Sequence, residues 1–185
     1  MGPPGAGKGT QSSRVAAQCS VPTISTGDIF RALQTADTVL AAQVREIMAR
    51  GGYVDDETTN AIVADRLAAR DCRDGFLLDG YPRTLRQVRT LDEMLAAAGE
   101  RLDAVICLQA DEEELVQRLL RRGLEQGRTD DTEGTIRTRL AVYQQQTAPL
   151  NEEYRRRSLL AEVDGLGPVD VVTGRIHRAL TALTS

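Results

Sequence analysis

The chain of 185 residues contains a single lysine, Lys8, which lies in a glycine-rich stretch with the sequence GPPGAGKGT at residues 2–10. Lys and Arg together number 23, so every other strong base is an arginine. A lysine ammonium is a compact charge on a flexible stem, whereas the guanidinium is a planar fork. A tight cradle of backbone N–H groups around a phosphate has room for the ammonium. We interpret Lys8 as a phosphate-binding residue, with chance placement as the alternative.

The stretch has the spacing of a phosphate-binding loop, in which G-x-x-x-x-G-K precedes Ser or Thr. Here Gly9 occupies the hydroxyl position, and Thr10 follows one place later. A helix is expected over residues 8–18, directly after the loop. The loop N–H groups would then lie at a helix N-terminus, where anions are stabilised. The shifted threonine indicates a narrower family than the general pattern.

The elements that must position this loop alternate along the chain. Short apolar runs predict strands at residues 23–25, 75–80, 104–108 and 159–163, and the second and third are expected to be buried. Helical periodicity and caps predict helices at residues 8–18, 26–34, 39–50, 56–70, 85–98, 112–122, 132–157 (bent at Pro149) and 169–183. A short polar loop is expected at residues 123–127. The alternation predicts an α/β fold in three layers, with helices on both faces of a parallel sheet.

Composition narrows the classes of protein further. The net charge of −4 gives no general attraction to nucleic acid or to anionic lipid. No apolar run has the length of a membrane span, and no signal peptide is expected at the start of the chain. Cys19, Cys72 and Cys107 are far apart and lack metal-ligand spacing, so we interpret them as reduced thiols. A cytoplasmic protein that binds neither nucleic acid nor membrane is therefore expected.

Three further motifs follow the loop. They are STGDIFR at residues 25–31, DGYPR at residues 79–83 and GRTDD at residues 127–131. In this order and spacing, the four motifs resemble those of nucleoside monophosphate kinases, and those of the adenylate kinase family in particular. The resemblance covers nearly the whole chain, and four motifs in register are far more specific than one.

The resemblance implies the reaction ATP + AMP ⇌ 2 ADP with Mg²⁺. Such a reaction needs positioning, charge neutralisation and exclusion of water rather than a strong base. The implied catalytic residues are Lys8, Arg83, Arg118, Arg122, Arg128 and Arg139. The implied ATP-binding residues are Gly5, Ala6, Gly7, Lys8, Gly9, Thr10, Arg118 and Arg122. The implied AMP-binding residues are Thr26, Arg31, Val54, Gly80, Arg83, Gln87, Arg128 and Arg139, and Asp79 would position Mg²⁺ through water.

Three side chains bear on the choice of base. Related pyrimidine kinases tend to have Ala at the position of Thr26, and Asn where Thr84 follows the Pro-Arg pair. Gln87 lies one helical turn after Arg83, where its amide could make a bidentate contact with the adenine edge. The backbone of residues 51–54 would supply further contacts. An exposed helical glutamine is the alternative for Gln87, and a kinase of UMP or CMP is the alternative function.

The resemblance also implies a division of the chain. The core would comprise residues 1–24, 56–121 and 133–185, with an AMP-binding segment at 25–55 and a short lid at 122–132. The lid lacks cysteine, so no structural zinc is expected. Asp130 and Asp131 would either cap the next helix or hold lid arginines. A monomer is expected.

Some charged residues are assigned no role in the site. The run of three arginines at residues 155–157 is expected to solvate a helix face. His177, the only histidine, is expected to face solvent on the last helix.

One departure from the family pattern lies at the start of the chain. A strand normally precedes this kind of loop at the middle of the sheet, but here Met1 adjoins Gly2. Neighbouring strands would then have unpaired backbone groups, which is costly in a core. A misassigned start, a deliberately shortened chain and a gapped or reorganised sheet remain open. A chain that binds nucleotide without turnover is therefore a further alternative function.

Overall fold

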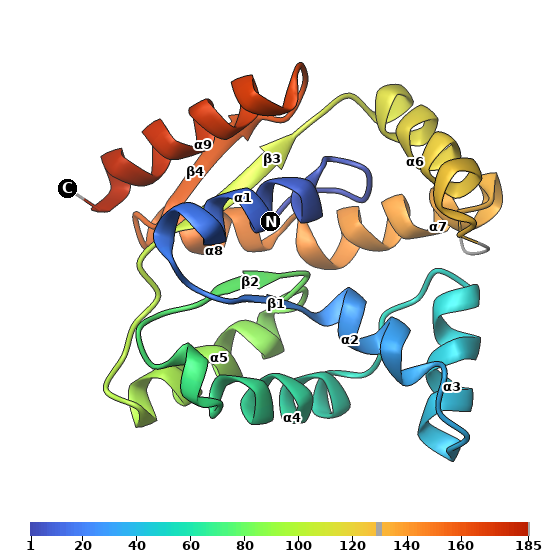
Figure 1. Ribbon diagram of the computed structural model, residues 1–185, viewed down its shortest axis with the longest axis horizontal. Helices are drawn as coiled ribbons and strands as arrows, with labels where there is room; N and C mark the ends of the chain where they lie inside the picture. Colours follow the sequence, from blue (N-terminus) through green and yellow to red (C-terminus); the bar gives the residue numbers. More distant parts are fainter. Residues whose placement is uncertain (129–130, 185) are drawn as a thin grey trace.

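The computed structural model describes residues 1–128 and 131–184. Its strands are β1 (Thr23–Ser25), β2 (Leu77–Asp79), β3 (Val105–Gln109) and β4 (Leu160–Asp164). Strand β1 pairs in parallel with β2, and β3 pairs in parallel with β4. Helices alternate with these strands along the chain and lie on both sides of them (Figure 1). The expected α/β fold with parallel strands is confirmed.

The sheet is divided into two pairs of strands. No strand among the described residues joins β2 to β3. Beside β3, the amino group of Met1 donates to the carbonyl oxygen of Ile106, and the N–H of Leu108 donates to the carbonyl oxygen of Met1 at 3.0 Å. This is the bonding pattern of a parallel bridge one residue long.

The divided sheet corrects one expectation about β2. The strand was expected to be buried over residues 75–80, but it spans only Leu77–Asp79, and all three residues are half-buried. Strand β2 hydrogen-bonds to β1 on one edge only. A strand with a neighbour on one edge remains more accessible than one in the middle of a sheet.

Side-chain caps explain where most helices begin. The helices are α1 (Lys8–Cys19), α2 (Thr26–Leu33), α3 (Val39–Ala49), α4 (Asp56–Leu67), α5 (Leu85–Ala97), α6 (Glu112–Gln126), α7 (Glu133–Val142), α8 (Leu150–Arg156) and α9 (Val169–Thr184). Ser, Thr or Asp caps six of them, at residues Ser25, Thr38, Asp55, Thr84, Asp111 and Thr132. Such oxygens accept from first-turn N–H groups that lack a helical partner. The remaining segments are a 3₁₀ turn at Arg70–Cys72 and a π-helical turn at Tyr143–Thr147.

Two expected helix boundaries were wrong. Helix α6 continues through the residues expected to form a polar loop, and it ends where Gly127 adopts a left-handed conformation with φ of 62°. A glycine takes this conformation without steric cost, which makes it a common helix terminator. Helix α4 ends at Leu67, short of the expected residue 70, and the 3₁₀ turn follows.

The long helix expected over residues 132–157 is also interrupted. Helix α7 ends at Val142, the π-helical turn follows, and α8 begins at Leu150 after Pro149. Proline has no N–H to donate, so it suits the start of α8 better than a helix interior. In the π-helical turn, the N–H of Ala148 donates to the carbonyl oxygen of Tyr143 at 2.9 Å. The helix was expected to bend at Pro149, but the interruption begins earlier, at Tyr143. Thr147, the last residue of the π-helical turn, is buried.

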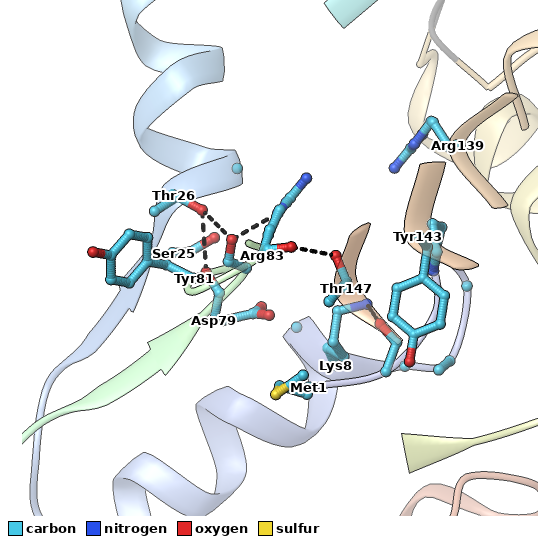
Figure 2. Close-up of a pocket in the computed structure, with 18 of the residues that line it drawn as sticks. Met1, Lys8, Ser25, Thr26, Asp79, Tyr81, Arg83, Arg139, Tyr143 and Thr147 are labelled. Carbon is cyan, nitrogen blue, oxygen red and sulfur yellow. Dashed lines mark hydrogen bonds between the residues drawn. The ribbon is translucent and has the colours of Figure 1, made fainter. Parts of the chain in front are cut away.

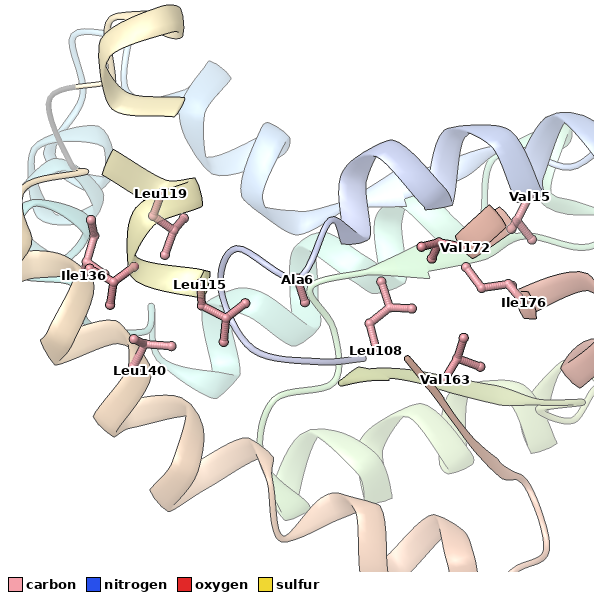
Figure 3. Close-up of a cluster of buried hydrophobic side chains, with 11 residues drawn as sticks. Ala6, Val15, Leu108, Leu115, Leu119, Ile136, Leu140, Val163, Val172 and Ile176 are labelled. Atoms are coloured by element: carbon pink, nitrogen blue, oxygen red, sulfur yellow. The ribbon is translucent and has the colours of Figure 1, made fainter. Parts of the chain in front are cut away.

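The largest core cluster is almost entirely aliphatic and anchors the loop of Lys8 (Figure 3). Ala6 of the loop is buried in this cluster, whose other members come from strands β3 and β4 and helices α1, α6, α7 and α9. Its other buried members are Val15, Leu108, Leu115, Val116, Leu119, Ile136, Leu140, Val163, Val172 and Ile176. The loop is therefore fixed to the core on one side, which leaves its other side for the site. Among the described residues, no helix combines the length and apolar character that a bilayer span requires.

Candidate active site

One cavity of about 770 Å³ brings together all seventeen residues that the sequence assigned to the site. It lies among the glycine-rich loop, the carboxyl ends of β1 and β2, residues 51–54, and helices α6 and α7. Figure 2 shows part of this lining. The assigned residues in the lining are Gly5, Ala6, Gly7, Lys8, Gly9, Thr10, Thr26, Arg31, Val54, Asp79, Gly80, Arg83, Gln87, Arg118, Arg122, Arg128 and Arg139.

The glycine-rich loop presents the start of α1 to the cavity. Gly5 and Gly7 have φ of 86° and 88°, and the N–H of Ala6 closes a turn onto the carbonyl oxygen of Pro3 at 3.2 Å. Gly7 lacks a side chain, so it caps the helix without satisfying any N–H group of the first turn. These N–H groups and the helix dipole make the start of α1 suited to bind an anion.

Lys8 is folded back onto its own loop. Its Nζ donates to the carbonyl oxygens of Gly2 and Pro3, each at 2.8 Å. Burial lowers the pKa of Lys8 to about 8, because the charged form loses water that the carbonyl oxygens replace only in part. An ammonium has three donors, so one remains for a phosphate oxygen. The two loop carbonyl oxygens therefore hold a compact ammonium group, as the sequence indicated for Lys8.

The carboxyl ends of β1 and β2 are tied together beside this loop. Thr26, which begins α2, donates from Oγ1 to the carbonyl oxygen of Gly80 at 3.0 Å. Gly80 has φ of +83°, and a Cβ there would lie 2.8 Å from Thr26 Oγ1 and 3.0 Å from the Arg83 guanidinium. Glycine is thus required both by the backbone conformation and by the lack of space. Asp79 precedes Gly80 in the chain. Its carboxylate lies close to the glycine-rich loop, because a Cβ placed on Gly9 would be 3.7 Å from Asp79 Oδ2.

Gln87 is buried rather than exposed on the surface of its helix. Its Oε1 accepts from the N–H of Arg83 at 2.7 Å, and its Nε2 donates to Asp56 Oδ1 at 2.8 Å. Asp56 also accepts from Thr84 Oγ1 at 3.0 Å. An amide has two donors and two acceptor positions, so each end of Gln87 keeps one for a ligand. Sequence reasoning missed Asp56, whose only signal is its place beside the helix-capping Asp55.

Arg83 lines the cavity and is held by its own loop and by Tyr53. Its Nε donates to the carbonyl oxygen of Gly80 at 2.7 Å, and its Cζ lies 4.6 Å from the centre of the Tyr53 ring. Burial lowers the pKa of Arg83 from its ordinary value, and the guanidinium remains charged at neutral pH. Among the described residues, no carboxylate forms an ion pair with it.

A buried carboxylate joins the two helices on the other side of the cavity. Asp131, whose side chain is fully buried, accepts from Arg122 of α6 at 2.7 and 2.8 Å and from Arg139 of α7 at 2.7 Å. Burial by itself raises the pKa of this carboxyl, but hydrogen bonds and charge from the arginines outweigh it and hold the pKa below its ordinary value. Since Thr132 caps α7, Asp131 holds arginines instead of capping the helix. Asp130 lies outside the described residues.

The remaining arginines of the site line the cavity and contact other groups of the chain. Arg118 donates to Glu114 at 2.8 Å and to the carbonyl oxygen of Gly165 at 3.2 Å. Arg31 forms an ion pair with Asp28 one turn earlier in α2. The backbone N–H of Arg128 donates to the carbonyl oxygen of Gly123 at 3.1 Å. The ion pairs of Arg118 and Arg31 are partly exposed, so exchanging their carboxylates for phosphate would cost little.

The side chains that were assigned no role lie outside the cavity lining. His177 is exposed on α9, as expected. The arginines at residues 155–157 are exposed and pair with Glu152, Glu153, Glu162 and Asp92. Sequence reasoning missed the lining residues Tyr53, Tyr143 and Thr147. Tyr53 had a weak signal as one of four tyrosines, beside the segment expected to contact the base.

The loop, the strand ends and the opposing arginines define a nucleotide-binding α/β phosphotransferase of the nucleoside monophosphate kinase class. The family model described as adenylate kinase matches residues 1–159. The chain is 59% identical over 180 residues to the adenylate kinase of Leifsonia xyli subsp. xyli, covering 97% of this chain and 90% of the relative. It is 54% identical over 185 residues to the adenylate kinase of Thermobifida fusca, covering 100% of this chain and 96% of the relative. The chain belongs to the adenylate kinase family.

Proposed function

We propose that this chain transfers the γ-phosphoryl group of Mg-ATP to AMP, giving two molecules of ADP. One observation carries the proposal: a single cavity is lined on one side by the phosphate-binding loop and on another by Arg83, Arg31 and Gln87. Two nucleotides that meet end to end would place both sets of phosphates within reach of Arg139 and Arg128. The names and the identity of the relatives support AMP as the acceptor.

The ATP phosphates would bind at the start of α1. The N–H groups of the loop and the ammonium of Lys8 would hold the β- and γ-phosphates, and Arg118 and Arg122 would contact the outer part of the nucleotide. Lys8 already lies among loop carbonyl oxygens at 2.8 Å, so its charge is positioned before the phosphate arrives. Preorganised charge of this kind lowers a barrier because it needs no rearrangement during reaction.

The AMP phosphate would bind to the guanidinium of Arg83, with Arg31 at the rim. Gln87, Thr26 and the backbone around Val54 would contact the base. An oxygen of the AMP phosphate would form a bond to the γ-phosphorus while the bond from that phosphorus to the β–γ bridging oxygen breaks. The electron pair of the broken bond stays on the β-phosphate of the departing ADP. No general base is needed, because the attacking oxygen is already an anion.

The residues around Asp79 fit a magnesium ion held through water. The Asp79 carboxylate ends a parallel strand beside Gly9, and among the described residues it accepts no hydrogen bond that would occupy it. Mg²⁺ keeps several of its waters in nucleotide sites, so a carboxylate at this position suits its hydration shell. When bound, Mg²⁺ would neutralise charge on the phosphate oxygens during transfer.

The proposal includes three coarser features. A monomer is proposed as the active unit. A cytoplasmic location is likewise proposed, on the wide spacing and odd number of the three cysteines. The division into a core, an AMP-binding segment at residues 25–55 and a lid at 122–132 is likewise proposed.

A coupled assay of the purified chain tests the function. Mg-ATP with AMP should give ADP, whereas UMP or CMP should give little. A preference for UMP or CMP would favour a pyrimidine nucleotide kinase instead. Lys8→Met should lower kcat by about three orders of magnitude or more, because it removes charge that stabilises the transferring group. A chain that binds ATP but forms no ADP would show the nucleotide-binding alternative to be right.

A further inference from the structure

Tyr53 approaches the site from the loop between α3 and α4, and its ring faces the guanidinium of Arg83 at 4.6 Å. Of the arginines in the lining, Arg31, Arg118, Arg122 and Arg139 each contact a carboxylate. Arg83 instead contacts an aromatic face and a carbonyl oxygen. An aromatic face attracts and orients a guanidinium without neutralising it. The charge of Arg83 therefore remains available to an incoming phosphate.

A chain of hydrogen bonds fixes the position of this ring. Thr147 of the π-helical turn donates from Oγ1 to the carbonyl oxygen of Arg83 at 3.0 Å. The same Oγ1 lies 3.0 Å from the hydroxyl of Tyr53. A threonine hydroxyl has one hydrogen, so Tyr53 must be the donor in the second bond. Thr147 thus joins the ring and the backbone of the arginine that the ring faces.

The segment around Tyr53 also contacts α7. A Cβ on Gly51 would lie 3.0 Å from the carbonyl oxygen of Thr135, and Thr135 Oγ1 donates to the carbonyl oxygen of Ala49 at 3.4 Å. The end of α3 and the following loop are therefore held at α7 as well as at the π-helical turn. Figure 2 shows Thr147 beside Arg83, with Tyr143 of the same turn nearby.

We propose that Tyr53 is a positioning residue for the AMP phosphate, acting through Arg83, with Thr147 as the hydroxyl that holds both. The inference rests on the proposed function, since it explains how the binding site for the acceptor, AMP, is built. The ring sets the plane of the guanidinium, and the hydroxyl chain sets the position of the ring. Because Tyr53 adjoins Val54, the same loop positions the base-contacting backbone and the phosphate-binding arginine together.

Kinetics of matched variants test this role. Tyr53→Leu removes both ring and hydroxyl, and it should raise KM for AMP about tenfold while KM for ATP stays within twofold. Tyr53→Phe keeps the ring and should raise KM for AMP only about twofold to threefold. Thr147→Val removes both hydrogen bonds of the hydroxyl and should raise KM for AMP at least as much as Tyr53→Phe, whereas Thr147→Ser keeps the hydroxyl and should keep the wild-type value. Tyr154→Phe is the control, since Tyr154 lies under Arg157 outside the cavity and should leave both KM values unchanged.

A double-mutant cycle separates positioning from general packing. In an Arg83→Met background, Tyr53→Leu should change KM for AMP by less than twofold, because its effect passes through the missing guanidinium. Melting temperatures of all variants are measured alongside. The inference fails if Tyr53→Leu leaves KM for AMP unchanged, if KM for ATP rises in parallel, or if the effect persists in the Arg83→Met background.

Calorimetric titration with AMP distinguishes this failure from failure of the proposed function. A wild-type chain that binds no AMP would overturn the proposed function, and the inference with it. A wild-type chain that binds AMP, together with a Tyr53→Leu variant that binds it equally well, would overturn the inference alone.

Discussion

Arg122 donates two hydrogen bonds to the carboxylate of Asp131, at 2.7 and 2.8 Å, and so joins the end of α6 to the start of α7. The carboxylate also accepts from Arg139 at 2.7 Å. One buried negative charge therefore holds two arginines of the site at a fixed separation. Such charge-assisted, bidentate contacts are among the strongest hydrogen bonds in proteins.

Asp131→Asn should lower the free energy of unfolding by about 2 kcal/mol, because it leaves two half-buried guanidinium groups without a compensating charge. Urea denaturation measures the change. The control is Glu133→Gln, which removes the exposed partner of Arg137 and should cost about 0.5 kcal/mol or less. Equal losses in the two variants would contradict a special role for Asp131.

The low pKa of Asp131 has a consequence in acid. Its folded-state pKa lies below the ordinary value of 3.8, so its contribution is present above that pH and is lost as the pH falls through the folded value. The difference in unfolding free energy between wild type and Asp131→Asn should therefore be constant from pH 7 to about 5 and shrink below about pH 4. Denaturation midpoints across this range measure it. A difference that stays constant down to pH 2 would refute the assignment.

The binding of ATP should weaken in alkali because of Lys8. Burial lowers the pKa of Lys8 to about 8 from 10.5, so the free protein loses this positive charge as the pH rises through 8. Calorimetry without Mg²⁺ should show affinity for ATP falling above pH 8 with a dependence on one proton. Asp79→Asn should move the decline to lower pH, because the charge of Asp79 raises the pKa of Lys8. A Lys8→Met variant that shows the same decline would point to another group.

The lowered pKa of Lys8 also affects the stability of the fold. Rising pH weakens the binding of ATP but increases the contribution of Lys8 to the free energy of unfolding. Between about pH 8 and 10.5 the folded chain has lost the proton of Lys8 while the unfolded chain still binds it. Unfolding then takes up a proton, so this residue makes the free energy of unfolding rise with pH in that range. Comparison with Lys8→Met isolates the contribution, which should vanish in the variant.

Lys8→Arg should not preserve activity, although it preserves charge. The ammonium fits between the carbonyl oxygens of Gly2 and Pro3, and a planar guanidinium is too large for that position. We expect kcat to fall by about 100-fold or more while the melting temperature changes little. Arg14→Lys, at an exposed ion pair with Asp170, is the matched control and should leave kcat unchanged. A Lys8→Arg variant with wild-type kcat would show that charge alone is required.

Tyr154→Phe should stabilise the protein. The ring of Tyr154 is fully buried, and its hydroxyl has no hydrogen-bond partner among the described residues. Removing an unsatisfied buried hydroxyl while keeping the ring should raise the free energy of unfolding by about 1 kcal/mol. Tyr81→Phe provides the contrast, because the Tyr81 hydroxyl donates to Asn60 at 2.8 Å and its removal should destabilise. Destabilisation by both variants would contradict the expectation.

The sequence by itself determined the order of the elements and predicted seventeen residues that line one cavity. Helix starts depend on caps such as Thr84 and Asp55, and strand positions depend on short apolar runs. These signals act over a few residues, so they can be recognised without a fold. The residues assigned to the site all line one cavity because the motifs lie at the loop, at strand ends and on the helices that meet there. What each does in catalysis remains a prediction.

Tertiary structure alone decided how these residues are held. Tyr53 meets Thr147 across 94 positions of the chain, and Gln87 meets Asp56 across 31. The π-helical turn and the division of the sheet into two pairs likewise depend on what packs alongside them. Lys8 shows the two levels together: its place in a glycine-rich loop is local, whereas its lowered pKa arises from burial. Local patterns specify which chemical groups are present, but burial and long-range partners set their charge and orientation, because both depend on the surroundings that only the folded chain supplies.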